Sequence, residues 1–116
     1  MEGGGPVHRS GAGANLDLLD GFWRRRPFHD MTIAAVSALN RRVVIRLEEF
    51  TLVLTGATGL KRCDLPTVWL AESVPRHPGG FKLNVNTQAG RLDVSGVDVR
   101  LIRNSDLAVL IPPIDP

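Results

Sequence analysis

Alternation of apolar and polar residues through the second half of the chain constrains the fold most strongly. Residues 81–86 place an apolar side chain at every second position, and the same pattern returns in residues 91–94 and 97–101. Successive side chains of a β-strand point to opposite faces of a sheet, so the pattern predicts strands with one buried and one solvated face. Such strands are typical of antiparallel sheets.

Shorter apolar runs in the rest of the chain extend this prediction. Further strands are expected over residues 31–39, 43–48, 50–54, 67–74 and 108–111. Asn40-Arg41 separates the first two of these runs as a tight connection, which indicates a hairpin. The sequence therefore predicts a mainly β, antiparallel sandwich or partly open barrel of about seven or eight short strands.

The alternation also assigns the two faces of the later strands. Residues expected to face the core are Phe81, Leu83, Val85, Leu92, Val94, Val97, Val99 and Leu101. Residues expected to face water are Lys82, Asn84, Asn86, Asp93, Asp98 and Arg100. Glycine and proline mark the connections, so residues 56–59 are predicted to form a turn and residues 75–80 a loop.

The N-terminal part of the chain has a different composition. Residues 1–14 are rich in glycine and have no hydrophobic periodicity, which predicts a flexible tail. Asn15 is a good N-cap, apolar residues follow it at helical spacing, and Pro27 disfavours helical geometry at Arg26. We therefore expect one short helix or strap after the tail, within a single β-dominated domain over residues 15–116.

Composition and charge narrow the class of protein. No segment approaches the ~20 apolar residues that cross a bilayer, so we expect no membrane association, and we see no secretion signal. The single cysteine, Cys63, cannot form an intramolecular disulfide, which favours a reducing compartment and a cytoplasmic location. The net charge of +2 is far from the strongly basic balance of nucleic-acid binders.

The densest polar and aromatic cluster is residues 22–30, which contains Trp23-Arg24-Arg25-Arg26 at the end of the predicted helix. Arginines beside aromatic rings can bind phosphates and stack on bases. Consecutive residues point in different directions, however, so nucleic-acid binding through Arg24–Arg26 is the less favoured interpretation. The favoured one is a strap whose aromatic residues anchor it to the core while its arginines stay solvated.

His29 and Trp69 are the other candidate site residues. His29 precedes Asp30, and such a pair could perform acid–base chemistry. Neighbours on an extended backbone point to opposite faces, so a structural role is favoured for both. Trp69 lies in a predicted strand, where it could line a ligand cavity or contribute to a partner surface.

The sequence carries no motif for a metal or a cofactor. Its three histidines are widely spaced, and it contains no Cys-x-x-Cys or His-x-x-x-His pairing. The glycines of residues 56–59 lack the Lys-Ser/Thr of a phosphate-binding loop. We therefore expect no cofactor and no metal, we assign no catalytic residue, and an enzyme is the less favoured class.

These observations favour a non-catalytic protein-interaction or binding module. The alternatives are a small-molecule-binding barrel or weak enzyme with a cavity near Trp69, and the nucleic-acid binder described above. Val44, Val53 and Ile102 lie opposite the main apolar rows of their strands, which would leave apolar side chains on a solvated face. A homodimer that covers this face is the simplest explanation, and the alternative is a sandwich in which some strands are buried on both sides. A different protein partner is a further candidate.

Overall fold

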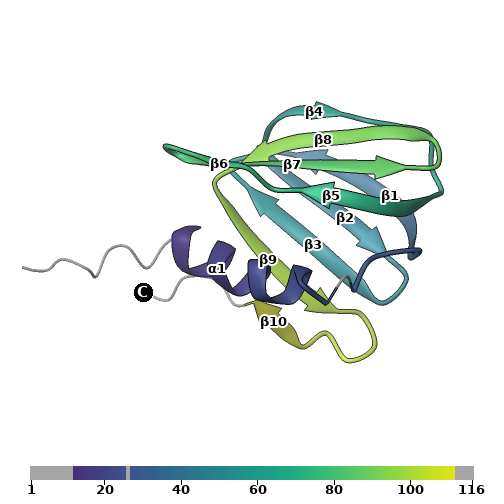
Figure 1. The fold of residues 1–116 in the computed structure, drawn as a ribbon, viewed down its shortest axis with the longest axis horizontal. Helices are drawn as coiled ribbons and strands as arrows, with labels where there is room; N and C mark the ends of the chain where they lie inside the picture. The colour runs from purple at the N-terminus through teal and green to yellow at the C-terminus, as the bar shows by residue number, and fades with distance from the viewer. Residues whose placement is uncertain (1–11, 26, 112–116) are drawn as a thin grey trace, which may run out of the picture.

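The computed structural model describes residues 12–25 and 27–111. In this range one helix, α1 (Ala12–Trp23), precedes a 10-stranded antiparallel sheet, which confirms the mainly β prediction (Figure 1). The strands are β1 (Thr32–Leu39), β2 (Arg42–Leu47), β3 (Phe50–Thr55), β4 (Thr58–Lys61), β5 (Thr67–Ser73), β6 (Arg76–His77), β7 (Gly80–Thr87), β8 (Gly90–Gly96), β9 (Asp98–Arg103) and β10 (Val109–Ile111). No helix in the described ranges is both long enough and apolar enough to cross a lipid bilayer.

The strand order divides the sheet into two halves. It runs β10-β9-β3-β2-β1-β5-β7-β8-β4, with β6 paired to β7. The halves meet where β1 pairs with β5 at Thr32 and Ile33, opposite Val68 and Thr67. Beyond this short pairing β1 and β5 separate, and the guanidinium of Arg62 donates a hydrogen bond to a β1 carbonyl, that of Val36 (2.7 Å). The sheet therefore curls around the core without closing, as the prediction of a partly open barrel requires.

A second junction joins the two halves because two strands continue from one half into the other. β3 runs into β4, β8 runs into β9, and these continuous strands pair with each other on both sides of the bend. At the bend the N–H of Val97 donates to the carbonyl of Thr55 (2.9 Å). Gly56 is needed here, because its φ is +63° and a Cβ would lie 2.6 Å from Cγ2 of Val97.

Two strands lie where the sequence predicted a turn and a loop. Thr58–Lys61 forms β4 because it pairs with β8. The glycines in and beside this segment had indicated a turn instead. Arg76–His77 forms β6 by pairing with the first residues of β7. Both are short strands whose existence depends on a partner rather than on local alternation.

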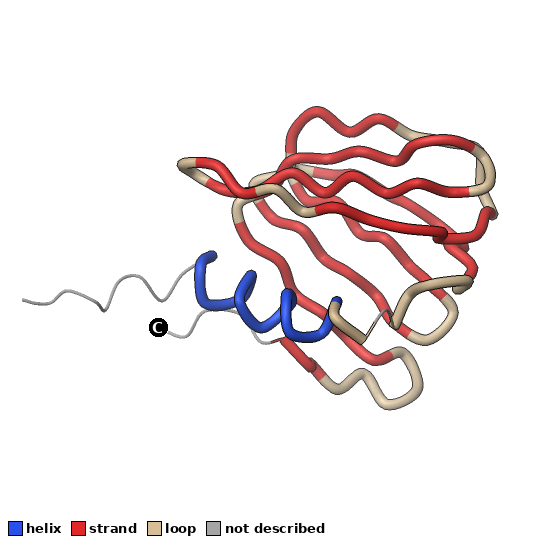
Figure 2. Tube along the Cα trace, viewed as in Figure 1, coloured by secondary structure: helices blue, strands red, loops and turns tan. Residues whose placement is uncertain are grey.

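The helix differs in its limits from the prediction. It begins at Ala12 and ends at Trp23, so Asn15 lies inside it and residues 12–14 belong to it rather than to a tail. Residues 1–11 of the predicted tail lie outside the described residues. The helix runs along β9 and β10 and lies across the open side of the curled sheet (Figures 1 and 2).

The core fills the inside of the curled sheet and extends to the helix. Leu16 and Leu19 of α1 are buried with the inward residues of the strands. Aromatic rings link the helix to both halves, since the ring centroid of Phe22 lies 5.5 Å from that of Phe50, and the centroids of Phe28 and Trp69 are 5.0 Å apart. Such ring contacts add about 0.5–1.5 kcal/mol each beyond the area that they bury.

Ion pairs also join the helix to the hairpin of β6 and β7. Arg76 of β6 bonds the carboxylate of Asp17 (2.8 Å) and also that of Asp20, both on α1. The β6–β7 hairpin thereby holds a helix that is distant from it in sequence. Because these groups are partly exposed, we expect each ion pair to contribute less than about 1 kcal/mol.

The predicted faces hold for most of the later strands, with two corrections. Seven of the eight residues expected in the core are buried, namely Phe81, Leu83, Val85, Leu92, Val94, Val99 and Leu101. Val97 is 46% exposed, because it occupies the bend between β8 and β9, where the alternation starts again in a new phase. Asp93 is 7% exposed although it was expected to face water, because β7 and β4 flank it on both sides.

Candidate functional site

The structure separates the residues that the sequence grouped as a candidate site. Arg24 and Arg25 follow α1 and are exposed, whereas Arg26 lies outside the described residues. Trp23 is the last residue of α1, and its side chain is also outside the described part. Trp69 is fully buried in the core, so it cannot itself contribute its ring to a surface.

His29 is brought next to β5, the strand that holds Trp69. Its side chain is 48% exposed, and its Nδ1 lies 2.8 Å from the carbonyl oxygen of Leu70. Because a carbonyl can only accept, this contact requires a proton on Nδ1. The Nε2 atom lies 3.6 Å from Oδ2 of Asp30. The ring of His29 therefore bonds the backbone of β5 through Nδ1, while Nε2 faces the carboxylate of Asp30 beyond hydrogen-bond distance.

A cavity of about 160 Å³ opens beside this histidine, lined by His29, Leu70, Ala71 and Glu72. It lies at an irregularity of β5, which pairs with β7 at Trp69 and again at Ala71 but loses its register between them. An irregularity of this kind releases the intervening backbone from the ladder and turns its side chains. The same strand holds Glu72, whose Oε1 accepts a hydrogen bond from Nε1 of Trp69 (2.6 Å).

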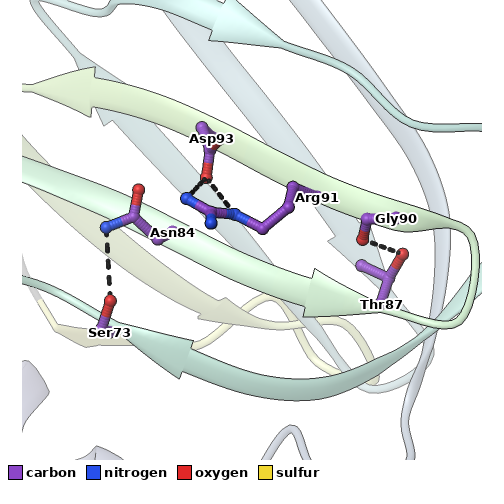
Figure 3. A network of polar contacts seen from close by, with 6 residues as sticks. All are labelled: Ser73, Asn84, Thr87, Gly90, Arg91 and Asp93. Atoms are coloured by element: carbon purple, nitrogen blue, oxygen red, sulfur yellow. Dashed lines mark hydrogen bonds and ion pairs between the residues drawn. The ribbon is translucent and has the colours of Figure 1, made fainter.

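A second polar arrangement lies on the outer face of β5, β7 and β8 (Figure 3). Nη2 and Nε of Arg91 donate to Oδ1 of Asp93 at 3.1 and 3.3 Å. The amide nitrogen of Asn84 donates to Oγ of Ser73 (3.3 Å), and Figure 3 shows its oxygen on the opposite side. That oxygen is buried and has no hydrogen-bond partner in the described part of the chain. The charged pair therefore lies within β8, and the Asn84–Ser73 hydrogen bond joins β7 to β5.

The outer face of the other half is apolar at its centre. Val44 lies directly across from Val53, and Ile102 lies across from Val109. The first three of these side chains are half-buried, and Val109 is 45% exposed. We call these four residues the apolar strip. Three of them were predicted from the sequence to lie on a solvated face, and the structure places them there.

Arginines surround the apolar strip on β2 and β9. Arg46 lies across from Thr51, and Arg100 lies across from Val53. Within residues 12–25 and 27–111, neither of these guanidinium groups has a hydrogen-bond or ion-pair partner. Two apolar side chains beyond the strip, Leu39 and Leu107, are 75% and 73% exposed.

A groove of about 520 Å³ marks one end of this face, between Arg46, Thr51 and Leu107. The neighbouring turn carries an ion pair in which Nη2 of Arg103 lies 2.8 Å from Oδ2 of Asp106. The hydrogen bonds from Arg103, followed by that from the N–H of Ala108, lower the pKa of Asp106 to about 2. This pair therefore stays charged at any ordinary pH.

The described residues contain no group of three or more histidine, cysteine or acidic side chains placed to hold a metal. No protein-family model matches the sequence, and neither the curated proteins nor the solved structures include a match. The candidate sites are therefore the outer faces of the two halves of the sheet and the cavity beside His29. Sequence reasoning missed Glu72 as a cavity residue, because only the irregularity of β5 brings it beside His29.

Proposed function

We propose that this chain is a non-catalytic protein-interaction module that forms a homodimer through the outer face of β2, β3, β9 and β10. The observation that carries the proposal is the apolar strip of Val44, Val53, Ile102 and Val109. Beside it lie Arg46 and Arg100, whose guanidinium groups have no partner in the described part of the chain. Contiguous apolar surface rimmed by polar residues is typical of protein–protein contact sites.

The charges at the two ends of β2 favour a second copy of this chain as the partner. Exposed Arg41 and Arg42 lie where the strand begins, and exposed Glu48 and Glu49 follow its end. A two-fold axis through the middle of β2, near Val44, would place the arginines of one copy over the glutamates of the other. The same face is then complementary to itself.

The first test is the oligomeric state, measured by light scattering behind a sizing column at micromolar concentration. We expect a mass of about twice 12.6 kDa for the natural chain and a mass near 12.6 kDa for Val53→Lys, because the introduced ammonium would be buried in the dimer. Asn86→Lys, on the outer face of β7, is the matched control and should remain a dimer. A natural chain that stays monomeric across a wide concentration range would disprove the proposal.

A charge exchange tests the two-fold arrangement itself. Arg42→Glu should weaken the dimer by about tenfold, because it places an acidic group over Glu48 and Glu49 of the other copy. Adding Glu49→Arg should restore most of the affinity. If the double variant is no tighter than Arg42→Glu alone, the copies do not meet with these ends opposed.

A further inference from the structure

We propose that the cavity beside Trp69 binds a primary alkylammonium group, such as a lysine side chain of a partner or a small free amine. The cavity is lined by His29, Leu70, Ala71 and Glu72, none of which belongs to the apolar strip. The inference goes beyond the proposed dimer and does not depend on it.

The first argument is the balance of donors and acceptors on the cavity wall. The Nδ1 proton of His29 is used by the carbonyl of Leu70, and its Nε2 faces the carboxylate of Asp30 at 3.6 Å. Oε1 of Glu72 is used by the indole of Trp69, and Oε2 has no partner within the described residues. The open side-chain atom on the wall is thus the carboxylate oxygen Oε2 of Glu72, which can only accept, so a matching ligand must donate a hydrogen bond.

The second argument is charge. Glu72 is a carboxylate on the wall, and Asp30 lies beside His29, with its Oδ2 atom 3.6 Å from Nε2 of the ring. Among residues 12–25 and 27–111, no lysine or arginine lines the cavity. A cation is therefore favoured over a neutral donor and over any anion. An ammonium group offers three N–H donors in a compact volume, which suits the open carboxylate oxygen of Glu72.

The third argument is size and wall chemistry. A volume of about 160 Å³ accommodates an ammonium group and a few methylenes, and it is smaller than the roughly 300–1,000 Å³ of sites for larger ligands such as nucleotides. Leu70 and Ala71 supply apolar surface along which an alkyl stem can lie. A metal ion would need more ligands than this wall provides, and no three-ligand cluster exists in the described residues.

The test is a two-dimensional amide NMR titration of the full chain with n-butylammonium chloride. We expect saturable shifts at residues 29 and 69–72 and at the indole N–H of Trp69, with a Kd of the order of millimolar. The neutral analogue 1-butanol and sodium chloride should leave these signals in place. Equal shifts with 1-butanol, or no localised shift up to about 100 mM amine, would overturn the proposal.

Glu72→Gln is the decisive variant, because its amide oxygen can still accept the hydrogen bond from Trp69 while the negative charge is lost. We expect the amine to bind at least about fivefold more weakly, with the remaining spectrum unchanged. Asp64→Asn removes an exposed acid outside both the cavity and the dimer face and should leave the affinity as it is. His29→Ala serves as a second variant if Glu72→Gln unfolds. Unchanged affinity in a folded cavity variant would show that the amine binds elsewhere.

Two sources of the alkylammonium group can then be distinguished with Nα-acetyl-lysine methylamide. Tighter binding of this compound than of n-butylammonium would identify a lysine within a polypeptide as the ligand. Equal binding would identify a free amine. Failure of both to bind would overturn the inference while leaving the dimer, which is measured by mass, unaffected.

Discussion

Leu83 and Lys82 are neighbours on β7 that occupy opposite environments. Leu83 is 2% exposed inside the curled sheet, whereas Lys82 is exposed on its outer face. Alternation predicted both positions correctly, because β7 pairs in regular register with β8 along its whole length.

Substitution by aspartate should change the stability of the fold very differently at these two positions. Leu83→Asp should destabilise the fold by about 4 kcal/mol or more, because it places a carboxylate among apolar side chains. Lys82→Asp should change stability by no more than about 0.5 kcal/mol, since its side chain stays in water. Urea denaturation followed by circular dichroism measures both, and equal midpoints for the two variants would contradict the assigned register.

The burial of Asp93 and the exposure of Val97 could not be predicted from the alternation of apolar and polar residues. Asp93 stands at a position of the outward phase, yet it is buried because Arg91 pairs with it and because β4 covers the far side of β8. Val97 continues an apolar pattern, yet it is exposed because the strand bends there. Both outcomes depend on which strands lie alongside, and a single sequence does not contain that information. The unpredicted position of Glu72 in the cavity has the same cause.

The hairpin of β1 and β2 was predicted correctly from the sequence, although its turn residues, Asn40-Arg41, are not the pair that such turns favour. Asn40 and Arg41 both have positive φ, at 52° and 61°. This pairing belongs to two-residue hairpin turns that favour Asn-Gly, because a residue with a Cβ is strained in the second position. The strands on either side specify the hairpin strongly enough for arginine to be tolerated there.

Arg41→Gly should therefore stabilise the chain by about 0.5 kcal/mol. Relief of about 1 kcal/mol of strain outweighs the smaller entropic cost of a glycine in the unfolded chain. Chemical denaturation at a concentration where the mass is unchanged measures the effect. Arg42→Gly, one residue later in β2, is the control and should destabilise. A loss of stability in Arg41→Gly would mean that the arginine side chain contributes contacts that outweigh the strain.

At the scale of the whole molecule, the helix and both halves of the sheet share one core. Leu19, Leu52 and Leu83 come from α1, from the β3 half and from the β7 half, and they belong to a single buried cluster. The continuous strands β3–β4 and β8–β9 cross between the halves. Neither half could bury its apolar face without the other.

We therefore expect a single cooperative unfolding transition. In a Trp23→Phe variant, fluorescence reports on the buried Trp69 alone, and its denaturation curve should coincide with that of circular dichroism, which reports on all strands. Separate midpoints for the two signals would show that one half of the sheet unfolds while the other persists.

The separation of β1 from β5 has a consequence for the behaviour of the protein at high concentration. Where two strands part, the bare backbone of each offers a template on which a foreign strand can add, and fibrils grow by this kind of addition. On β1 the guanidinium of Arg62 occupies the carbonyl of Val36, at the place where such growth would start. A bulky, permanently charged group thus covers the backbone of β1 at this opening and opposes the addition of a foreign strand there.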